Sequence, residues 1–468
     1  MAATELPPQL TDPSFRSRRT QNWLILGGLY ALFYMTRYNF AATMGDLAET
    51  FGWTNSDLGK FEFMMPLIYG LAVVLNGPIA DRIGGKKAFL TGAVGVFFMN
   101  LAFGACFLLL QTPAVVQGTG HHVEVLTPAV LAGGMSPKTL LWLMVAIWGV
   151  NGYFQSFGAL SIVKVNAQWF HVRERGTFAG IFGVLIRLGL LLAFSGVPLL
   201  ASTLGLRWAY WLPGLLVGVF FVLNWFFMEN SPKDAGFDEL DTGDASSDEG
   251  GARPSLVFLL KKIFASRAAW TIALASMMIG MVRRSTTDSW NSKYFKDVYE
   301  TLHGGDIATW LPWQSTAWGI ALLGIAGGFA FGIASDRKFG GRRAPVIVFG
   351  FAGMAVVLAL FGLADRLQLG PWPAVISISC LSFFVNGAHG MIGGAASMDF
   401  GGKKAAATAA GLFDGMQYLA AAFVGPGMGW VLDTWGWKAW QWWPIPFALV
   451  GAAIMSTLWN VVPGRRGH

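Results

Sequence analysis

Apolar stretches long enough to cross a lipid bilayer recur along the whole chain. A membrane-spanning helix needs about 20 predominantly apolar residues, and about twelve such windows occur here. The chain is 54% hydrophobic and 13% charged, whereas soluble domains carry about 25% charged residues. These features predict an all-α polytopic membrane protein with twelve transmembrane helices, at roughly 22–45, 60–80, 88–110, 139–165, 176–200, 206–228, 268–290, 311–335, 343–364, 372–397, 405–430 and 440–462.

The two halves of the chain repeat one another in the same order. The motif GPIADRIGGKK over 77–87 recurs as GIASDRKFGGRR over 332–343, and VNGYFQSFG from Val150 recurs as VNGAHGMIG from Val385. Such a repeat predicts two parallel six-helix bundles. An acidic, Ser- and Gly-rich segment separates them and is typical of a flexible linker. We therefore expect an N-terminal bundle over 1–228, a cytoplasmic linker over 229–267 and a C-terminal bundle over 268–468.

The basic residues indicate how the chain is oriented. The formal net charge is +7, but the lysines and arginines gather on the side of the predicted membrane that holds both termini. Because basic loops stay in the cytoplasm, both termini are expected there, in a multi-pass protein of the cytoplasmic (inner) membrane. The same distribution explains the positive charge without nucleic acid. The residues on that side include Arg16, Arg18, Arg19, Lys86, Lys87, Arg173, Arg175, Lys261, Lys262, Arg342, Arg343, Lys403, Lys404, Arg465 and Arg466.

Two arginines lie deep inside apolar stretches at matching places in the two halves. Arg37 and Arg284 each follow a tryptophan, Trp23 or Trp270, by fourteen residues. An arginine at membrane depth costs about 2.5 to 3.5 kcal/mol, so an anion is expected to offset it. The guanidinium fork suits phosphate oxygens, which predicts one anion site between the repeats. The alternative is a local ion pair, and Asp288, four residues after Arg284, offers one for that arginine.

Several motifs resemble one transporter family. The repeated GxxxDR loop resembles the major facilitator superfamily. YMTRYNFAATMGDL over 34–47, RRSTTDSWNSKYFKDV over 283–298 and DFGGKKAAATAAG over 399–411 are similar to its organophosphate:phosphate antiporters. That family includes glycerol-3-phosphate, hexose-phosphate and phosphoglycerate transporters. The resemblance implies two bundles around a central cavity, rocker-switch alternating access, and phosphoryl binding by Arg37 and Arg284. The neighbouring Arg283 remains an alternative to Arg284.

The repeated loop also predicts a gate. It places a carboxylate followed by an arginine at the cytoplasmic end of a helix in each half, where the carboxylate can meet the positive N-terminus of a neighbouring helix. We expect these contacts to form and break during the transport cycle. The residues concerned are Asp81, Arg82, Asp336 and Arg337.

The sequence also departs from the family pattern. Val73 stands where the family has a lysine in span two, and Ile186 where the glycerol-phosphate branch has a histidine. Further charges lie in the spans instead: Lys164, Arg187, Asp288 and Asp414. Since spans five and eleven are repeat mates, we expect Arg187 and Asp414 to form a buried pair, which is either structural or in contact with substrate.

Other polar side chains of the spans suit the organic part of a ligand. Tyr34, Tyr38, Asn39 and Gln155 could bind sugar or glycerol hydroxyls, or hydrogen-bond inside the bundles. His389 could titrate near neutral pH and couple transport to protons, or simply form a hydrogen bond. No metal site is expected, because His121 and His122 have no third ligand nearby. No cofactor is implied either.

These observations together predict a secondary transporter, expected to be a monomer, that exchanges an organic phosphate for inorganic phosphate without an enzymatic step. Two cations about 10 Å apart at an effective dielectric of 20 repel by about 1.7 kcal/mol, which would disfavour closing the empty carrier. Two functional alternatives stay open. One is a membrane sensor of hexose phosphate. The other is a proton-coupled transporter of another organic anion, served by Asp288, Asp414 and His389.

Overall fold

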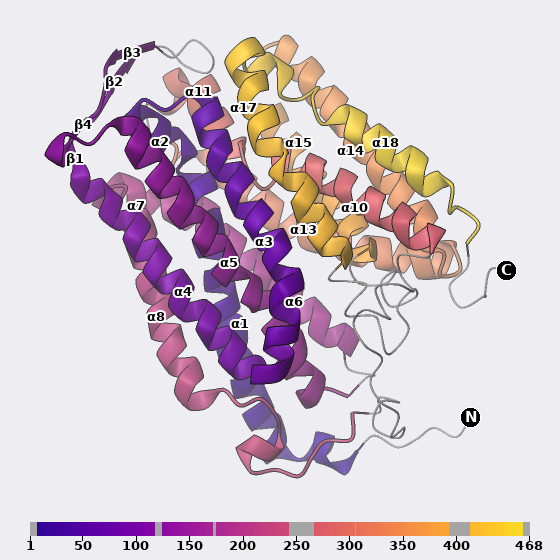
Figure 1. Ribbon diagram of the computed structural model, residues 1–468. Helices are drawn as coiled ribbons and strands as arrows, with labels where there is room; N and C mark the ends of the chain where they lie inside the picture. The colour runs from indigo at the N-terminus through magenta and orange to yellow at the C-terminus, as the bar shows by residue number, and fades with distance from the viewer. Residues whose placement is uncertain are drawn as a thin grey trace.

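The computed structural model describes residues 7–117, 124–171, 175–242, 266–304, 306–392 and 412–461. Long helices form almost all of it (Figure 1). The first half contains α1 (Pro13–Ala42), α2 (Met44–Phe51), α3 (Asn55–Ile83), α4 (Gly85–Ala105), α5 (Pro137–Trp169), α6 (Arg175–Leu191), α7 (Val197–Leu204) and α8 (Trp208–Phe227). The second contains α10 (Arg267–Ser285), α11 (Asn291–Val298), α12 (Glu300–His303), α13 (Leu311–Lys338), α14 (Arg343–Arg366), α15 (Trp372–Gly390), a helix over 412–422, α17 (Val424–Trp435) and α18 (Ile445–Ser456). The predicted all-α fold is confirmed.

Seven described helical segments are long and apolar enough to cross a membrane by length and composition. The other predicted spans correspond to helices that are more polar, shorter or interrupted. Span one lies in α1, span seven in α10 and span ten in α15, while span eleven is divided between 412–422 and α17, and span twelve lies in α18. A functional membrane protein is expected to depart from uniform apolarity in this way, because polar groups inside the membrane line binding sites.

A small β structure follows α4 on one end of the molecule. Strand β1 (Leu110–Thr112) pairs antiparallel with β4 (Val130–Leu131), and β2 (Val115–Gln117) pairs antiparallel with β3 (Glu124–Thr127). The amide of Ala114 donates to the carbonyl of Thr50 at 2.9 Å, which fastens this segment to α2. Figure 1 shows these strands together with α2 and α11 at the end of the molecule far from the N-terminus.

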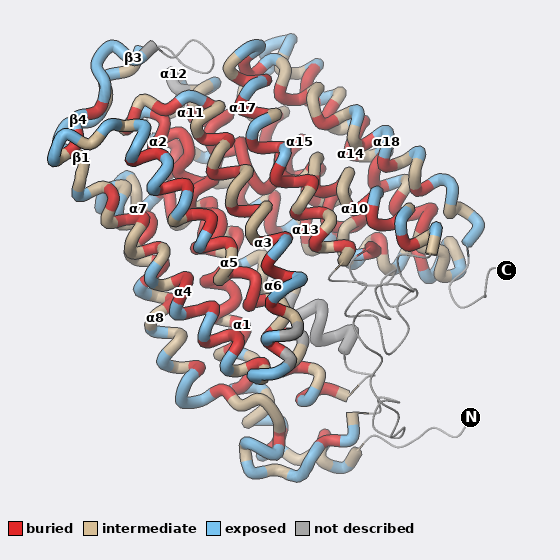
Figure 2. The backbone as a smooth tube through the Cα atoms, viewed as in Figure 1, coloured by how far each residue is buried: buried red, intermediate tan, exposed pale blue. Residues whose placement is uncertain are grey.

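Buried residues run along the inside of each bundle (Figure 2). Some of this interior is polar. Asn39 is fully buried and donates to the side chain of Asn100 at 3.0 Å and to the carbonyl of Ala209 at 3.2 Å, while Asn100 donates to Asn151 at 3.4 Å. All four residues belong to the N-terminal half. Asn39 therefore joins the helices of its own bundle, the second of its two predicted roles.

The first part of the predicted linker packs against the N-terminal half. The side chain of Asn22 donates to the carbonyl of Glu229 at 3.2 Å, Asn230 accepts from the amide of Lys86 at 2.7 Å, and Leu240 is buried. A flexible linker would make no such contacts, so the prediction of flexibility is wrong for residues 229–242. One of its negative charges is paired, since Glu229 forms an ion pair with Lys86 at 3.3 Å. Residues 243–265 lie outside the described residues.

The two halves touch closely at the end that carries the β strands. Asp433 of α17 accepts from the backbone amides of Asn55 at 3.0 Å and Ser56 at 2.8 Å. It thereby binds the positive N-terminus of α3 from the other half. Lys296 of α11 pairs with Asp46 and, at 2.9 Å, with Glu49, both on α2. Burial alone would lower the pKa of Lys296, but these two carboxylates raise it above its usual range.

Glycines permit this close approach. A Cβ atom on Gly425 of α17 would lie 2.3 Å from the carbonyl oxygen of Gly59 of α3, and one on Gly59 would lie 2.4 Å from the carbonyl oxygen of Gly425. These contacts are with backbone atoms, which cannot move aside as the end of a flexible side chain can. Small residues at helix interfaces in membranes serve this purpose. The contact between α3 and α17 thus depends on both residues.

We expect Gly425→Ala to destabilise the protein by about 1 to 3 kcal/mol, because the added methyl group overpacks the α3–α17 contact. Gly328→Ala on α13 is the matched control: a Cβ there meets nothing within 4 Å, so this variant should be neutral or slightly stabilised. Thermal unfolding in detergent measures both. Equal melting temperatures for the two variants would mean that the α3–α17 contact is looser than described.

Candidate anion-binding site

Arg37 of α1 is 2% exposed and contacts only neutral partners among the described residues. Its Nε and Nη2 donate to the side-chain oxygen of Gln155 at 3.3 and 3.2 Å, and its Nη1 donates to the hydroxyl of Tyr418 at 3.2 Å. The guanidinium also lies 4.9 Å from the ring centre of Tyr34 and 4.6 Å from that of Tyr69. No ion pair with a described carboxylate offsets its charge.

Gln155 is oriented by a second hydrogen bond. Its amide nitrogen donates to the hydroxyl of Thr36 at 3.1 Å, which leaves the amide oxygen facing Arg37. Gln155 is fully buried, so this pairing holds the guanidinium in place without neutralising it. Of the predicted polar ligands, Gln155 and Tyr34 thus lie against Arg37.

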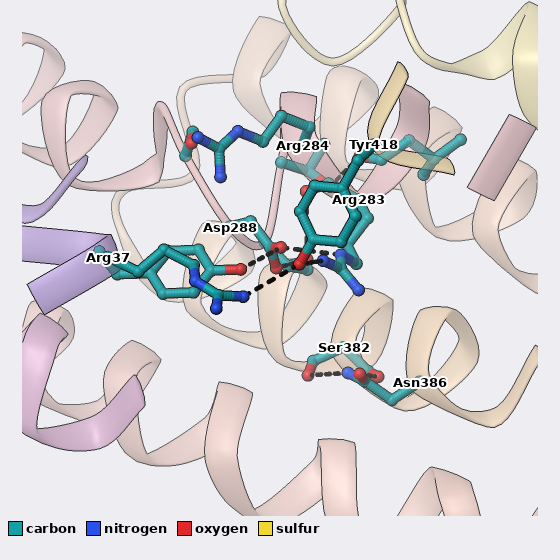
Figure 3. A network of polar contacts seen from close by, with 12 residues as sticks. Arg37, Arg283, Arg284, Asp288, Ser382, Asn386 and Tyr418 are labelled. Atoms are coloured by element: carbon teal, nitrogen blue, oxygen red, sulfur yellow. Dashed lines mark hydrogen bonds and ion pairs between the residues drawn. The ribbon is translucent and has the colours of Figure 1, made fainter. Parts of the chain in front are cut away.

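Arg283 of α10 approaches the same tyrosine from the other half. Its Nη2 donates to the hydroxyl of Tyr418 at 3.4 Å, and its Nε lies 2.8 Å from Asp288. Asp288 also accepts from the hydroxyl of Tyr38 at 2.9 Å. Figure 3 shows Arg37 and Arg283 on opposite sides of Tyr418. The hydroxyl oxygen of Tyr418 therefore accepts a hydrogen bond from one guanidinium of each half of the chain.

Arg284 turns away from this meeting point. Its Nε lies 2.7 Å from Oε2 of Glu62 on α3, without the alignment of a hydrogen bond, and the side chains are 5% and 1% exposed. The same carboxylate oxygen accepts from the hydroxyl of Ser289 at 2.7 Å. Arg284 thus has an ionic partner across the two halves, whereas Asp288 pairs with Arg283. Sequence reasoning missed Glu62, although a lone glutamate in an apolar span was the available signal.

Span seven is interrupted directly after the two adjacent arginines, which both lie in the last turn of α10 and point in different directions from it. Helix α10 ends at Ser285, and α11 begins at Asn291 after Trp290, which has φ of 63°. A bulky residue with positive φ is an outlier that the surrounding packing must hold, and Trp290 is fully buried. The interruption carries Asp288 and Ser289 toward the first half. Interrupted helices are a recurrent feature of transporter binding sites.

Arg187 does not pair with Asp414, so that prediction is wrong. Its Nη2 donates to the side chain of Asn386 on α15 instead. The reason is packing: α6 lies against α13, and a Cβ on Gly324 of α13 would lie 3.3 Å from the Arg187 guanidinium carbon. Asn386 is fixed by donating to Ser382 (Figure 3). Repeat symmetry does not determine which faces of the matched helices meet.

The remaining predicted residues are dispersed. Val73 is buried against Tyr69 and Tyr418, so an apolar contact replaces the family's lysine. Lys164 donates to the carbonyl of Ala80 at 3.0 Å, away from the arginines. His389 is partly buried in α15 and makes no hydrogen bond among the described residues.

The gate residues are described in part. Asp336 forms an ion pair with Arg343 at 2.8 Å within its own half, and Arg82 and Arg337 are exposed. The side chain of Asp81 lies outside the described residues. So do His121, His122 and the motif over 399–411. Their predicted roles remain predictions.

The fold and this polar centre agree with a family comparison. The family model of the Major Facilitator Superfamily matches residues 26–312, which is more than half of the chain. The chain belongs to that superfamily. As its members are transporters, the prediction of a protein without an enzymatic step is confirmed.

Two of the following three relatives are named for hexose phosphate transport. A probable hexose phosphate transport protein of Chlamydia muridarum is 23% identical, over 97% of this chain and 93% of its own length. Membrane sensor protein UhpC of Salmonella typhimurium is 26% identical, over 92% and 90%. A hexose-6-phosphate:phosphate antiporter of the same organism is 24% identical, over 88% and 83%. The predicted resemblance to organophosphate:phosphate antiporters is confirmed.

Among solved structures, that of a D-xylose–proton symporter aligns with a TM-score of 0.68. It covers 95% of this chain and 98% of that one, at 16% sequence identity. At this identity the likeness shows the fold alone. It confirms the predicted major facilitator arrangement of two helical bundles.

We expect Glu62→Gln to lower the free energy of unfolding by about 3 kcal/mol, because Arg284 would remain buried without its counter-ion. Adding Arg284→Gln should restore part of that loss, since the double variant buries no net charge. A double-mutant cycle from denaturation in detergent measures the coupling. Additive effects would show that the two side chains do not interact in the membrane protein.

Proposed function

We propose that this chain is a secondary transporter of the cytoplasmic membrane that exchanges an organic phosphate ester for inorganic phosphate by alternating access. One observation carries the proposal: guanidinium groups from the two halves, Arg37 and Arg283, converge on the hydroxyl of Tyr418. The names of the relatives support the substrate class. No covalent chemistry is required, because transport needs only binding and conformational change.

A phosphoryl group suits this convergence. Its oxygens are strong acceptors, and a planar guanidinium can bind two of them at once. A phosphoryl group seated beside Tyr418 would accept from Arg37 and Arg283 together. Because the arginines belong to different halves, such a ligand stabilises the arrangement in which the halves are close. A ligand can shift a conformational equilibrium only through such differential contacts.

The contacts between the halves support an inward-facing arrangement. Asp433 with the α3 N-terminus and Lys296 with α2 join the halves at the end bearing the β strands. With both termini in the cytoplasm, that end faces outward. The centre would then be approached from the cytoplasm until these contacts break.

Substitution of the arginines tests the proposal. Arg37→Lys and Arg283→Lys should each weaken phosphate binding by roughly 30- to 5,000-fold, since lysine keeps the charge but loses the fork. Their combined effect should be less than the product of the two, because both act on one ligand. Binding to purified, folded protein, followed by calorimetry or a labelled phosphate, measures these changes.

Arg284→Lys is the matched control next to Arg283. With Glu62 as its partner, Arg284 should affect phosphate affinity less than Arg283 and the conformational equilibrium more. The reverse ranking would return the ligand role to Arg284, as the family alignment predicts. The proposed anion site would be refuted if phosphate still binds to a triple variant that carries Arg37→Ala, Arg283→Ala and Arg284→Ala.

A membrane sensor is the second candidate, favoured by the 26% identity to sensor protein UhpC. Phosphate-loaded proteoliposomes distinguish the two functions. A transporter takes up labelled organic phosphate against unlabelled internal phosphate, whereas a sensor binds the ester without such counterflow. Uptake driven by a proton gradient, without internal phosphate, would favour the proton-coupled alternative.

The proposed orientation has its own test. A cysteine at Lys233, which is exposed after α8, should react with a membrane-impermeant maleimide only after the cytoplasmic face is opened. A cysteine at Thr127 in β3 is the opposite-side control and should react in intact cells. Both variants are made in a background without Cys106 and Cys380, the two native cysteines. Labelling of Lys233→Cys in intact cells would show that the orientation is the opposite of the one proposed.

A further inference from the structure

Asp414 stands beside the proposed phosphate site. It lies on the helix over 412–422, four residues before Tyr418, so both side chains are on one face of that helix. The rise of an α-helix puts their Cα atoms about 6 Å apart along its axis. The chain runs from this helix into α17, whose Asp433 contacts α3 at the end with the β strands. In the proposed orientation Asp414 therefore lies one turn closer to the cytoplasm than Tyr418 does.

Asp414 is the unpaired acid of the described centre. Asp288 pairs with Arg283 and Glu62 pairs with Arg284, but no hydrogen bond or ion pair of Asp414 occurs among the described residues. It is partly buried, and the cations that act on it electrostatically are Arg283 and Arg37. An ionised carboxylate withdrawn from bulk water needs a partner.

The charges of the centre indicate what that partner is. With Arg283 and Arg284 neutralised by carboxylates, Arg37 and Arg187 are the arginines there whose described partners are neutral, Gln155, Tyr418 and Asn386. A phosphate ester carries nearly two negative charges at neutral pH, so in the total charge of the centre it balances the two positive charges that no carboxylate pairs with. The carboxylate of Asp414 would then lie beside the bound phosphate ester, and no positive charge would remain to compensate it. A ligand that also brings a positive charge removes this conflict.

We propose that the organic group of the substrate carries an ammonium nitrogen, which Asp414 binds while the phosphoryl group contacts Arg37 and Arg283. The substrate class is a zwitterionic phosphate ester, such as an amino sugar phosphate or an aminoalkyl phosphate. This inference rests on the proposed function and specifies its substrate. A hydroxyl group at the same place would hydrogen-bond to Asp414 but leave its charge uncompensated.

The geometry suits such a ligand. Asp414 and Tyr418 are one helical turn apart on one face, so a ligand with a small carbon skeleton can contact both side chains. Tyr34 and Tyr69, whose rings flank Arg37, supply apolar faces for the skeleton. Val73, where the family has a lysine, leaves this side of the centre without a competing ammonium group.

Competition in phosphate-loaded proteoliposomes tests the inference. Entry of labelled phosphate is measured against two matched pairs: glucosamine 6-phosphate with glucose 6-phosphate, and O-phosphoethanolamine with ethylene glycol monophosphate. In each pair the first compound carries an ammonium group where the second carries a hydroxyl group. In the wild-type protein the ammonium member of at least one pair should compete at roughly 10- to 30-fold lower concentration.

Asp414→Asn should reduce that ratio to near one, and Asp414→Glu should retain a preference for the ammonium member. The ratio is taken within each variant, so a general loss of transport does not imitate the effect. Asp365→Asn, which removes a carboxylate that accepts from Tyr294 at 2.8 Å in the outer part of the second half, is the matched control and should keep the wild-type ratio.

Three results would overturn the inference. The first is a wild-type protein that exchanges phosphate but does not prefer the ammonium member of either pair. The second is a preference that persists in Asp414→Asn. The third is proton uptake with the hydroxyl esters that Asp414→Asn abolishes, which would assign Asp414 to proton coupling. Absence of any phosphate exchange in the wild-type protein would instead refute the proposed function itself, so the two failures are distinguishable.

Discussion

The charge of Arg37 is the constraint on which the centre of this protein depends. A guanidinium cannot lose its proton, and this one is held at membrane depth by an amide, a hydroxyl and two aromatic rings. These partners satisfy its donors and leave its charge in place. The site is therefore ready for an anion before one arrives. Preorganisation of this kind reduces the free-energy cost of ordering the site when a ligand binds.

Glu62 changes the electrostatics expected for the empty carrier. From the sequence, two unpaired arginines facing each other across the cavity would repel and oppose closure. Glu62 neutralises Arg284 and joins the two halves in the described arrangement. The cost of reorientation then lies in separating a buried ion pair, which carries a large desolvation term. Either repulsion between unpaired arginines or separation of a buried ion pair can favour exchange. The second cost depends on one pair of residues, Arg284 and Glu62.

Sequence reasoning succeeded where a property belongs to a segment and failed where it depends on which faces meet. Span length and repeat order predicted the two bundles and brought Arg37 into the centre. The choice between Arg283 and Arg284 depends on which partner each one meets. Asp288, in the interruption after Ser285, pairs with Arg283, whereas Glu62 of the other half pairs with Arg284, and no periodicity encodes either contact. Arg187 meets Asn386 because α6 packs on α13, a contact between different bundles that symmetry within the repeat cannot supply.

The contacts between the halves divide by chemistry as well as by place. At the end with the β strands they are backbone caps and ion pairs, such as Asp433 with Ser56 and Lys296 with Glu49, whose groups can be hydrated when separated. In the centre they are buried, so separating them requires new partners for each charge. A ligand anion can serve as such a partner for Arg37 and Arg283. The contacts at the end with the β strands can therefore exchange with water, whereas opening of the centre must be coupled to what is bound there.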